Sequence, residues 1–299
     1  MNRLALCLWL LVLTTPPAQA ELRIFACEPE WGALVTELAA DRASVFVATT
    51  ALQDVHHIQA RPSLIAQVRR ADLVICTGAG LEAGWLPVLL RRSNNSKVLP
   101  GSAGYFMASD FVRMQSVPDT VDRADGDVHP EGNPHIHLDP RNYPPVARAL
   151  QQRLIELDSD NVDFYQQQGD EFLQRWQSAI KAWEQRAIPL ENMPTVVYHD
   201  AWIYLNNWLG LEQVAELEPK PGIPPTSGHL SGILKRMESQ PARVIIRAPY
   251  KPSRAADWLH ERTGIPVRVL PYTVGGNPQA DDLFGLFDST LSLLLGVSP

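Results

Sequence analysis

The chain has 299 residues, with 26 Lys and Arg against 33 Asp and Glu, and its formal net charge at pH 7 is −7. This acidic balance argues against a nucleic-acid partner, because phosphate backbones are bound through clustered Lys and Arg. The length is sufficient for two domains, each with a core of its own.

The first twenty residues have the pattern of a secretory signal. Arg3 provides a charged start, an apolar run extends from Leu4 to Leu13, and the small-x-small sequence AQA ends at Ala20. We expect cleavage after Ala20, and the apolar run is too short to span a bilayer. Cys7 lies inside the apolar run rather than at the cleavage point. The sequence therefore predicts a soluble exported protein without a lipid anchor.

Short apolar runs alternate with segments of helical spacing in both halves of the chain. The first half contains the runs LRIFACE, SVFVATT and DLVICTG, separated by WGALVTELAADR and PSLIAQVRRA. The second half contains TVVYHD, RVIIRAP and VRVLPY, which alternate with LSGILKRMESQ, SRAADWLHERTG and DDLFGLFDSTLSLLL. Strands that alternate with helices form parallel sheets covered on both faces. These patterns predict an α/β protein with two doubly wound lobes.

A long helix is predicted between the two halves, over residues 159–187. Apolar side chains such as Phe172, Trp176 and Ile180 recur there at helical spacing. At about 1.5 Å per residue this helix would be roughly 40 Å long, enough to join two lobes. We therefore divide the chain into a signal segment at 1–20, an N-terminal lobe at 21–158, a connecting helix at 159–187 and a C-terminal lobe at 188–299.

Two cysteines remain after removal of the signal segment, Cys27 and Cys76, each at the end of an apolar run. In an oxidising compartment they could form one disulfide, and two buried thiols are an equal alternative.

Histidines gather at the predicted carboxyl ends of strands. Of the eight in the chain, His56 and His57 follow the run SVFVATT, His135 and His137 lie in a proline-bounded loop, and His199 ends the strand TVVYHD. Loops from separate strands converge at this edge of an open α/β sheet, so we expect a metal site in the crevice between the lobes.

Three imidazole nitrogens suit Zn²⁺ and leave a fourth position for a carboxylate or water. Asp54, Asp139 and Asp200 lie near these histidines in sequence and are candidates to hold the other ring nitrogens. Any one histidine, taken alone, is more often a surface or structural residue than a ligand.

The motifs DVHHIQARPS, NPHIHLDPRN and VVYHDAWIYL, taken together, resemble the ligand motifs of the periplasmic receptors of zinc and manganese ABC importers, the cluster A-I family. The similarity extends from about residue 22 to the C-terminus and includes RRADLVICTGAGLEAGW and the long helix. Carried over residue by residue, it implies that His56, His135 and His199 bind the metal. His137 replaces an aromatic residue of the family pattern, and we interpret it as packed.

The fourth ligand departs from the family pattern. The resemblance implies a late acid where LPYTVGGNP has Tyr272, Thr273 and Val274, so Asp281 is our candidate. Asp281 could instead be an acid at the start of a helix, where it interacts favourably with the helix dipole. The fourth ligand would then be water. Arg247 also occupies a position where the family often has an acid, and a cation pointing into the site would oppose metal binding.

A short polar loop, DRADGDVHPEGNPH at residues 122–135, precedes the second ligand motif. Zinc receptors of this family often carry a loop rich in His and Asp at this point. His129 is a candidate auxiliary ligand, and an ordinary solvated loop is the alternative. His229 is expected to be structural.

These features together predict high-affinity periplasmic capture of Zn(II) and delivery to the permease of an ABC importer, by a monomer that is not an enzyme. A metallochaperone is an additional candidate partner. The alternatives are a manganese receptor of the same type, a secreted zinc hydrolase and a protein whose metal only stabilises its fold. The hydrolase alternative lacks an H-E-x-x-H helix.

Overall fold

The computed structural model describes residues 21–120, 126, 127 and 129–296. The predicted signal segment at 1–20 and part of the polar loop at 122–135 lie outside these residues. Every helix in the described part of the chain is too short or too polar to cross a membrane.

The first lobe is built on a four-stranded parallel sheet with the order β2-β1-β3-β4. Its strands are β1 (Leu22–Ala26), β2 (Ala43–Val47), β3 (Leu73–Cys76) and β4 (Tyr105–Met107), and its helices are α1 (Pro29–Ala39), α2 (Pro62–Arg70), α3 (Leu86–Ser93) and α4 (Tyr143–Leu157). Alternate residues of β1 face opposite sides, so Ile24 joins the core beside α1 and α4 while Phe25 joins the core beside α2 and α3. Both faces of the sheet are therefore covered.

The second lobe repeats this plan with the strand order β6-β5-β7-β8, again all parallel. Its strands are β5 (Pro194–Val197), β6 (Glu212–Glu216), β7 (Val244–Arg247) and β8 (Val267–Val269), and its helices are α6 (Ile203–Leu209), α7 (Ser227–Ser239) and α8 (Arg254–Thr263). The predicted fold class, two parallel α/β lobes, is confirmed.

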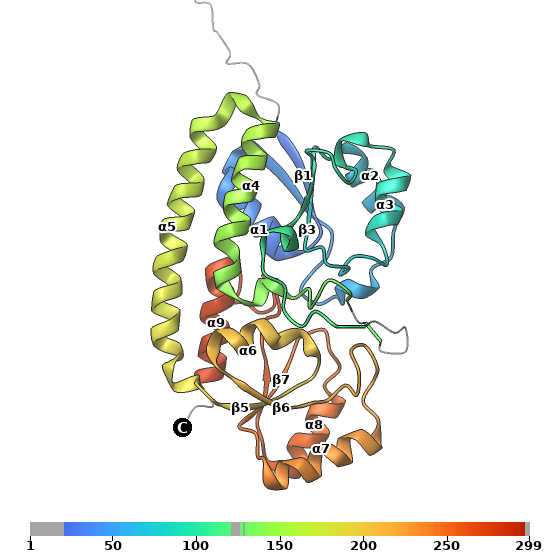
Figure 1. Ribbon diagram of the computed structural model, residues 1–299, viewed down its shortest axis with the longest axis vertical. Coiled ribbons are helices and arrows are strands. Elements are labelled where there is room, and N and C mark those ends of the chain that lie inside the picture. The colour runs from blue at the N-terminus through green and yellow to red at the C-terminus, as the bar shows by residue number, and fades with distance from the viewer. Residues whose placement is uncertain (1–20, 121–125, 128, 297–299) are drawn as a thin grey trace, which may run out of the picture.

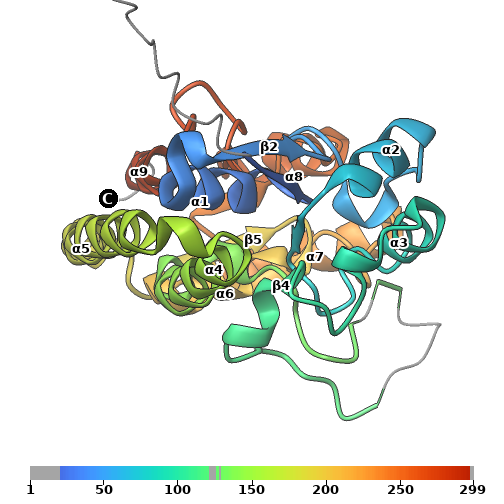
Figure 2. The same ribbon diagram turned by 90° about the horizontal axis from the view of Figure 1, so that it is seen from above.

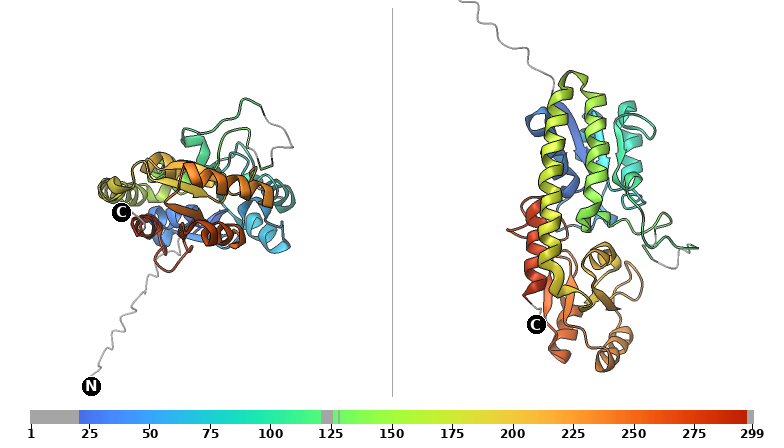
Figure 3. Two further views of the ribbon diagram at one scale, coloured as in Figure 1. Left: turned by 90° about the horizontal axis from the view of Figure 1, so that it is seen from below. Right: turned by 60° about the vertical axis from the view of Figure 1, so that its left-hand side comes forward.

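A single long helix, α5 (Val162–Ala187), runs beside both lobes, and α9 (Leu283–Leu295) packs against it (Figures 1 and 3). At about 1.5 Å per residue, α5 is roughly 40 Å long. Seen from above, α1, α5 and α9 lie together at one edge of the molecule, with α2 and α3 at the other (Figure 2). The C-terminal helix α9 also contacts α1, an element of the first lobe.

One continuous hydrophobic core extends through both lobes. Trp31 of the first lobe, Trp176 of α5 and Trp202 of the second lobe are all fully buried members of it. The Trp176 indole also donates a hydrogen bond of 2.8 Å to the Pro140 carbonyl. Because packed cores resist shear and opening, this shared core restricts movement of one lobe against the other.

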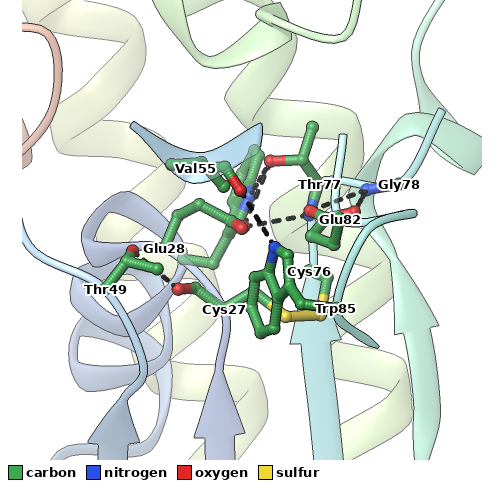
Figure 4. The surroundings of a disulfide bond; sticks show 10 residues. Cys27, Glu28, Thr49, Val55, Cys76, Thr77, Gly78, Glu82 and Trp85 are labelled. Carbon is green, nitrogen blue, oxygen red and sulfur yellow. Dashed lines mark hydrogen bonds between the residues drawn. A yellow bond between two sulfur atoms is a disulfide. The ribbon is translucent and has the colours of Figure 1, made fainter. Parts of the chain in front are cut away.

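A disulfide between Cys27 and Cys76 joins the ends of β1 and β3, with their Cα atoms 4.8 Å apart. Of the two alternatives that the sequence left open, the structure has the disulfide. Figure 4 shows that two acidic side chains, Glu28 and Glu82, lie beside it together with Thr77. Both sulfur atoms are buried and bonded to each other, so they are not available as thiolate ligands.

Candidate metal centre

Three histidines from three different loops meet between the lobes. His56 lies in the short turn Val55–His57 that follows β2, His135 precedes the turn Ile136–Leu138, and His199 follows β5. One ring nitrogen from each lies within 4.8 Å of the other two. The ring centroids are 5.7 Å apart for His56 and His135, 6.1 Å for His56 and His199, and 5.6 Å for His135 and His199.

The spacing of these nitrogens suits one small metal ion. Zn–N bonds of about 2.0–2.1 Å in a tetrahedron place the nitrogens roughly 3.4 Å apart. The three rings can reach that arrangement through small inward movements. The loops of His56 and His199 follow the parallel strands β2 and β5, and ligands collect beyond the carboxyl ends of strands in open α/β sheets.

Two of the three rings are held on the side away from the crevice. Nδ1 of His199 donates a 2.7 Å hydrogen bond to Glu218 Oε2. The Tyr272 hydroxyl and Nδ1 of His135 form a second hydrogen bond. These bonds fix each ring and leave Nε2 for a metal. For His56, Nε2 is buried without a hydrogen-bond partner among the described residues.

Burial keeps two of the three histidines in the form that binds metals. Burial, followed by the neighbouring histidines, holds the pKa of His56 and His135 well below the ordinary value of 6.5. Both imidazoles are therefore neutral at pH 7, with a lone pair available. Because these two pKa values are depressed, both imidazoles also stay neutral at pH values below 6.5.

The chain is similar to known proteins of metal uptake. A family described as "zinc-uptake complex component A periplasmic" matches residues 24–295. The chain belongs to this family. Among its relatives, the high-affinity zinc uptake system protein ZnuA of Yersinia pestis is 27% identical over 210 residues, which cover 65% of each chain. The manganese-binding lipoprotein MntA of Halalkalibacterium halodurans is 23% identical over 206 residues, covering 68% of this chain and 63% of MntA.

The chain thus spans slightly less than two thirds of the length of these two relatives. Among solved structures, a crystal structure of ZnuA matches with a TM-score of 0.77 and 18% identity over 94% of this chain and 100% of that one. At this level of identity, the match shows the shared fold.

The hydrogen-bond partners of the candidate ligand rings differ from those that the sequence predicts. Asp54 accepts a hydrogen bond from the backbone N–H of His56, at 3.2 Å, rather than from its ring. Asp139 binds the guanidinium of Arg141, and Asp200 interacts with Asn133. The partners of the rings are instead Glu218 and Tyr272, which sequence proximity to the histidines does not reveal.

Glu218 is charged although it is buried. Burial favours the neutral carboxyl, but the hydrogen bonds and charges of His199 and Lys251 outweigh this effect and hold its pKa below the ordinary value. Glu216 lies close by, and with His199 and Glu218 it forms a second group of potential ligands. Burial and the charges of Asp200 and Glu218 raise the pKa of Glu216 to about 8. Its carboxyl is therefore largely protonated at neutral pH.

Asp281 is exposed immediately before α9 and belongs to no group of potential metal ligands in the described part of the chain. Its neighbour Asp282 caps α9, accepting a hydrogen bond from the Gly285 N–H at 2.6 Å. Tyr272, in the segment where the resemblance implies an acid, forms a hydrogen bond with Nδ1 of His135. Arg247 donates to the carbonyls of Ala248 and Lys251.

His129 lies at the edge of the histidine group. Its ring centroid is 5.1 Å from that of His56, and its Nε2 is buried without a hydrogen-bond partner among the described residues. With His135 and His199 it lines a cavity of about 80 Å³. Burial lowers its pKa, so it too offers a neutral nitrogen.

His137 and His229 have structural partners. His137 is only 1% exposed, and its two ring nitrogens face the Tyr272 carbonyl at 3.0 Å and Glu30 at 3.4 Å. This agrees with the interpretation of His137 as a packed residue. Nε2 of His229 forms a 2.8 Å hydrogen bond with the Glu216 carbonyl, in line with its expected structural role.

Proposed function

We propose that this protein captures Zn²⁺ between its lobes through His56, His135 and His199 and delivers it to the permease of an ABC importer. The observation that carries the proposal is the convergence of three mostly buried imidazoles, two of them held from behind by hydrogen bonds to Glu218 and Tyr272. The family of zinc-uptake components to which the chain belongs supports this assignment.

The fourth position is proposed to hold a water molecule, with His129 as an auxiliary ligand at the mouth of the crevice. The unpartnered Nε2 of His129 and its distance of 5.1 Å from the His56 ring support this role. The position of Asp281, exposed at the start of α9, gives no support to its predicted role as a ligand.

Zinc is preferred over manganese on the chemistry of the donors. Three imidazole nitrogens suit Zn²⁺, whereas Mn²⁺ favours carboxylate and other oxygen ligands. The nearest ionised carboxylate, Glu218, already accepts hydrogen bonds from His199, Gly222 and Lys251. The relative named as manganese-binding makes Mn²⁺ the alternative cargo to test.

The chain is proposed to act as a transport receptor without catalytic turnover. A zinc hydrolase needs a general base beside the metal-bound water. Of the two acids that group with His199, Glu218 is held by hydrogen bonds and Glu216 is largely protonated. The shared core and α5 limit lobe movement, so release is proposed to follow from small loop rearrangements at the permease. We also propose that the protein is exported to the periplasm after cleavage at Ala20 and that it acts as a monomer.

Calorimetric titration of the mature protein with Zn²⁺ and Mn²⁺, beside His56→Ala, His135→Ala and His199→Ala, tests the proposal. We expect one tight zinc site that each substitution weakens strongly, with weaker binding of Mn²⁺. Zinc binding that survived all three substitutions would show that the ligands are wrong. Hydrolysis of peptide or ester substrates by the zinc-loaded protein would favour the enzyme instead.

A further inference from the structure

A buried lysine lies between the loops that carry His56 and His199. Lys251 follows β7 in the second lobe and is only 9% exposed. Its ammonium is 3.0 Å from Glu218 Oε1 and 3.6 Å from Asp54 Oδ2. Glu218 belongs to the second lobe and Asp54 to the first, so one side chain links carboxylates from both lobes.

Each of these carboxylates also holds a proposed ligand. The second oxygen of Glu218 accepts the hydrogen bond from Nδ1 of His199 at 2.7 Å. Oδ1 of Asp54 accepts the backbone N–H of His56 at 3.2 Å and so caps the turn on which His56 lies. A continuous chain of polar contacts therefore runs from His56 through Asp54, Lys251 and Glu218 to His199.

The position of Lys251 is itself fixed by its neighbours. The Arg247 guanidinium donates to the Lys251 carbonyl at 3.1 Å and so braces the turn after β7. The ammonium also lies 5.9 Å from the centre of the Tyr198 ring and 5.6 Å from that of Tyr250. Burying a charge is unfavourable unless it is paired, so this lysine strongly favours the arrangement that keeps both carboxylates close.

We propose that Lys251 is a positioning residue of the metal site, which ties the ligand loops of the two lobes at the spacing that zinc requires. This inference rests on the proposed function. Its main consequence is kinetic: ligands that are already positioned rebind a loosened ion before it escapes, so Lys251 slows zinc dissociation.

If Lys251 acts only through its charge, its removal is expected to change the zinc dissociation rate in the opposite direction. A cation near the site repels Zn²⁺, and it lowers the pKa of His56 in the same way. If Lys251 acted only through its charge, removing it would tighten zinc binding and slow dissociation. If it positions the ligands, removing it will accelerate dissociation despite the lost repulsion.

Stopped-flow transfer of zinc from the loaded protein to a chelator measures the dissociation rate. The visible spectrum of the Co²⁺-loaded protein reports the geometry of the metal site, and thermal melting of the apo-protein reports stability. The variants are Lys251→Met, Lys251→Arg and Asp54→Asn, and Lys235→Met removes a lysine charge from the exposed face of α7 as a control. We expect Lys251→Met to accelerate dissociation roughly 10–100-fold, the range typical for residues that support metal ligands. Asp54→Asn should act in the same direction, Lys251→Arg should restore part of the wild-type rate, and Lys251→Met should alter the Co²⁺ spectrum.

Unchanged or slower dissociation in Lys251→Met with an unchanged Co²⁺ spectrum would overturn the proposal, even if the melting temperature fell. Should Lys251→Met not fold, Asp54→Asn and Lys251→Arg decide the question by the same two readouts. Failure of the wild type and Lys235→Met to bind zinc would instead refute the proposed function, so the two failures are distinguishable.

Discussion

Glu218 Oε2 lies 2.7 Å from Nδ1 of His199, and both side chains are buried. This contact orients the imidazole, selects the tautomer that leaves Nε2 free, and makes that nitrogen a stronger donor. Glu218 is therefore part of the proposed zinc site, although it does not itself bind the metal.

Replacing Glu218 should weaken zinc binding without removing a ligand. We predict that Glu218→Ala raises the zinc dissociation constant roughly 10–100-fold, because His199 loses its orienting acceptor and Lys251 loses a partner. Competition with a chelator of known affinity measures the change. Glu212→Ala, at an exposed position on β6, is the control and should bind like the wild type. Equal affinities for both variants would contradict the supporting role.

Asp281 and His129 should differ in their effect on zinc. Asp281→Ala should leave the zinc affinity unchanged, because this carboxylate is exposed and lies outside the histidine group. His129→Ala should weaken binding by a smaller factor than His56→Ala, since an auxiliary ligand is lost while the three principal ones remain. Calorimetry of the three variants makes the comparison. A large loss of zinc affinity in Asp281→Ala would show that this acid is a ligand after all.

Two buried carboxyl groups should make the stability of the protein depend on pH. Glu82 accepts hydrogen bonds from the backbone N–H groups of Thr77 and Gly78, and burial raises its pKa to about 7 from an ordinary 4.5. Burial and the charge of Glu82 also raise the pKa of Glu28. The folded state thus binds these protons more tightly than the unfolded state, so stability is full below about pH 4.5 and is lost as pH rises through about 7.

The variant Glu82→Gln imitates the protonated acid and should reduce this loss. Between pH 5 and pH 8, we predict that the free energy of unfolding falls less in this variant than in the wild type. The difference is on the order of 3 kcal/mol at most, because one pKa unit corresponds to about 1.4 kcal/mol. Urea unfolding at both pH values measures it, with Glu238→Gln on the exposed face of α7 as the control. A fall as steep as that of the wild type would refute the role of Glu82.

The disulfide should contribute substantially to stability. Cys27 and Cys76 are 49 residues apart, and closing a loop of that length restricts the unfolded chain by about 4 kcal/mol. We predict that the Cys27→Ala and Cys76→Ala double variant loses several kcal/mol in urea unfolding, and that thiol reductant does not destabilise it further. A loss below about 1 kcal/mol would show that the cross-link adds little to the fold.

Sequence patterns predict the central strands and the long helix well, because β3 is a continuous apolar run and β1 is apolar except for Arg23. They do not predict β4, which has three residues, or β6, whose sequence EQVAE is largely polar at the edge of its sheet. The three histidines that meet in the crevice are also predictable, since each lies in a recognisable motif, two of them after strands and His135 ahead of α4.

The residues that support those histidines are not predictable by the same means. Glu218 is 19 residues from His199, and Tyr272 is 137 residues from His135, so only the fold brings each pair together. The acids adjacent in sequence, Asp139 and Asp200, have other partners. Nothing in the sequence around Lys251 indicates a role at the site either, because only the packing of the two lobes places it between two carboxylates.

The most direct test of the zinc site is a crystal structure of the zinc-loaded mature protein, with anomalous diffraction recorded on both sides of the zinc absorption edge. The proposed function predicts one strong anomalous peak between the lobes, about 2.0–2.1 Å from a ring nitrogen of each of His56, His135 and His199. A principal peak elsewhere, or one that lacked any of these three histidines as a ligand, would contradict it.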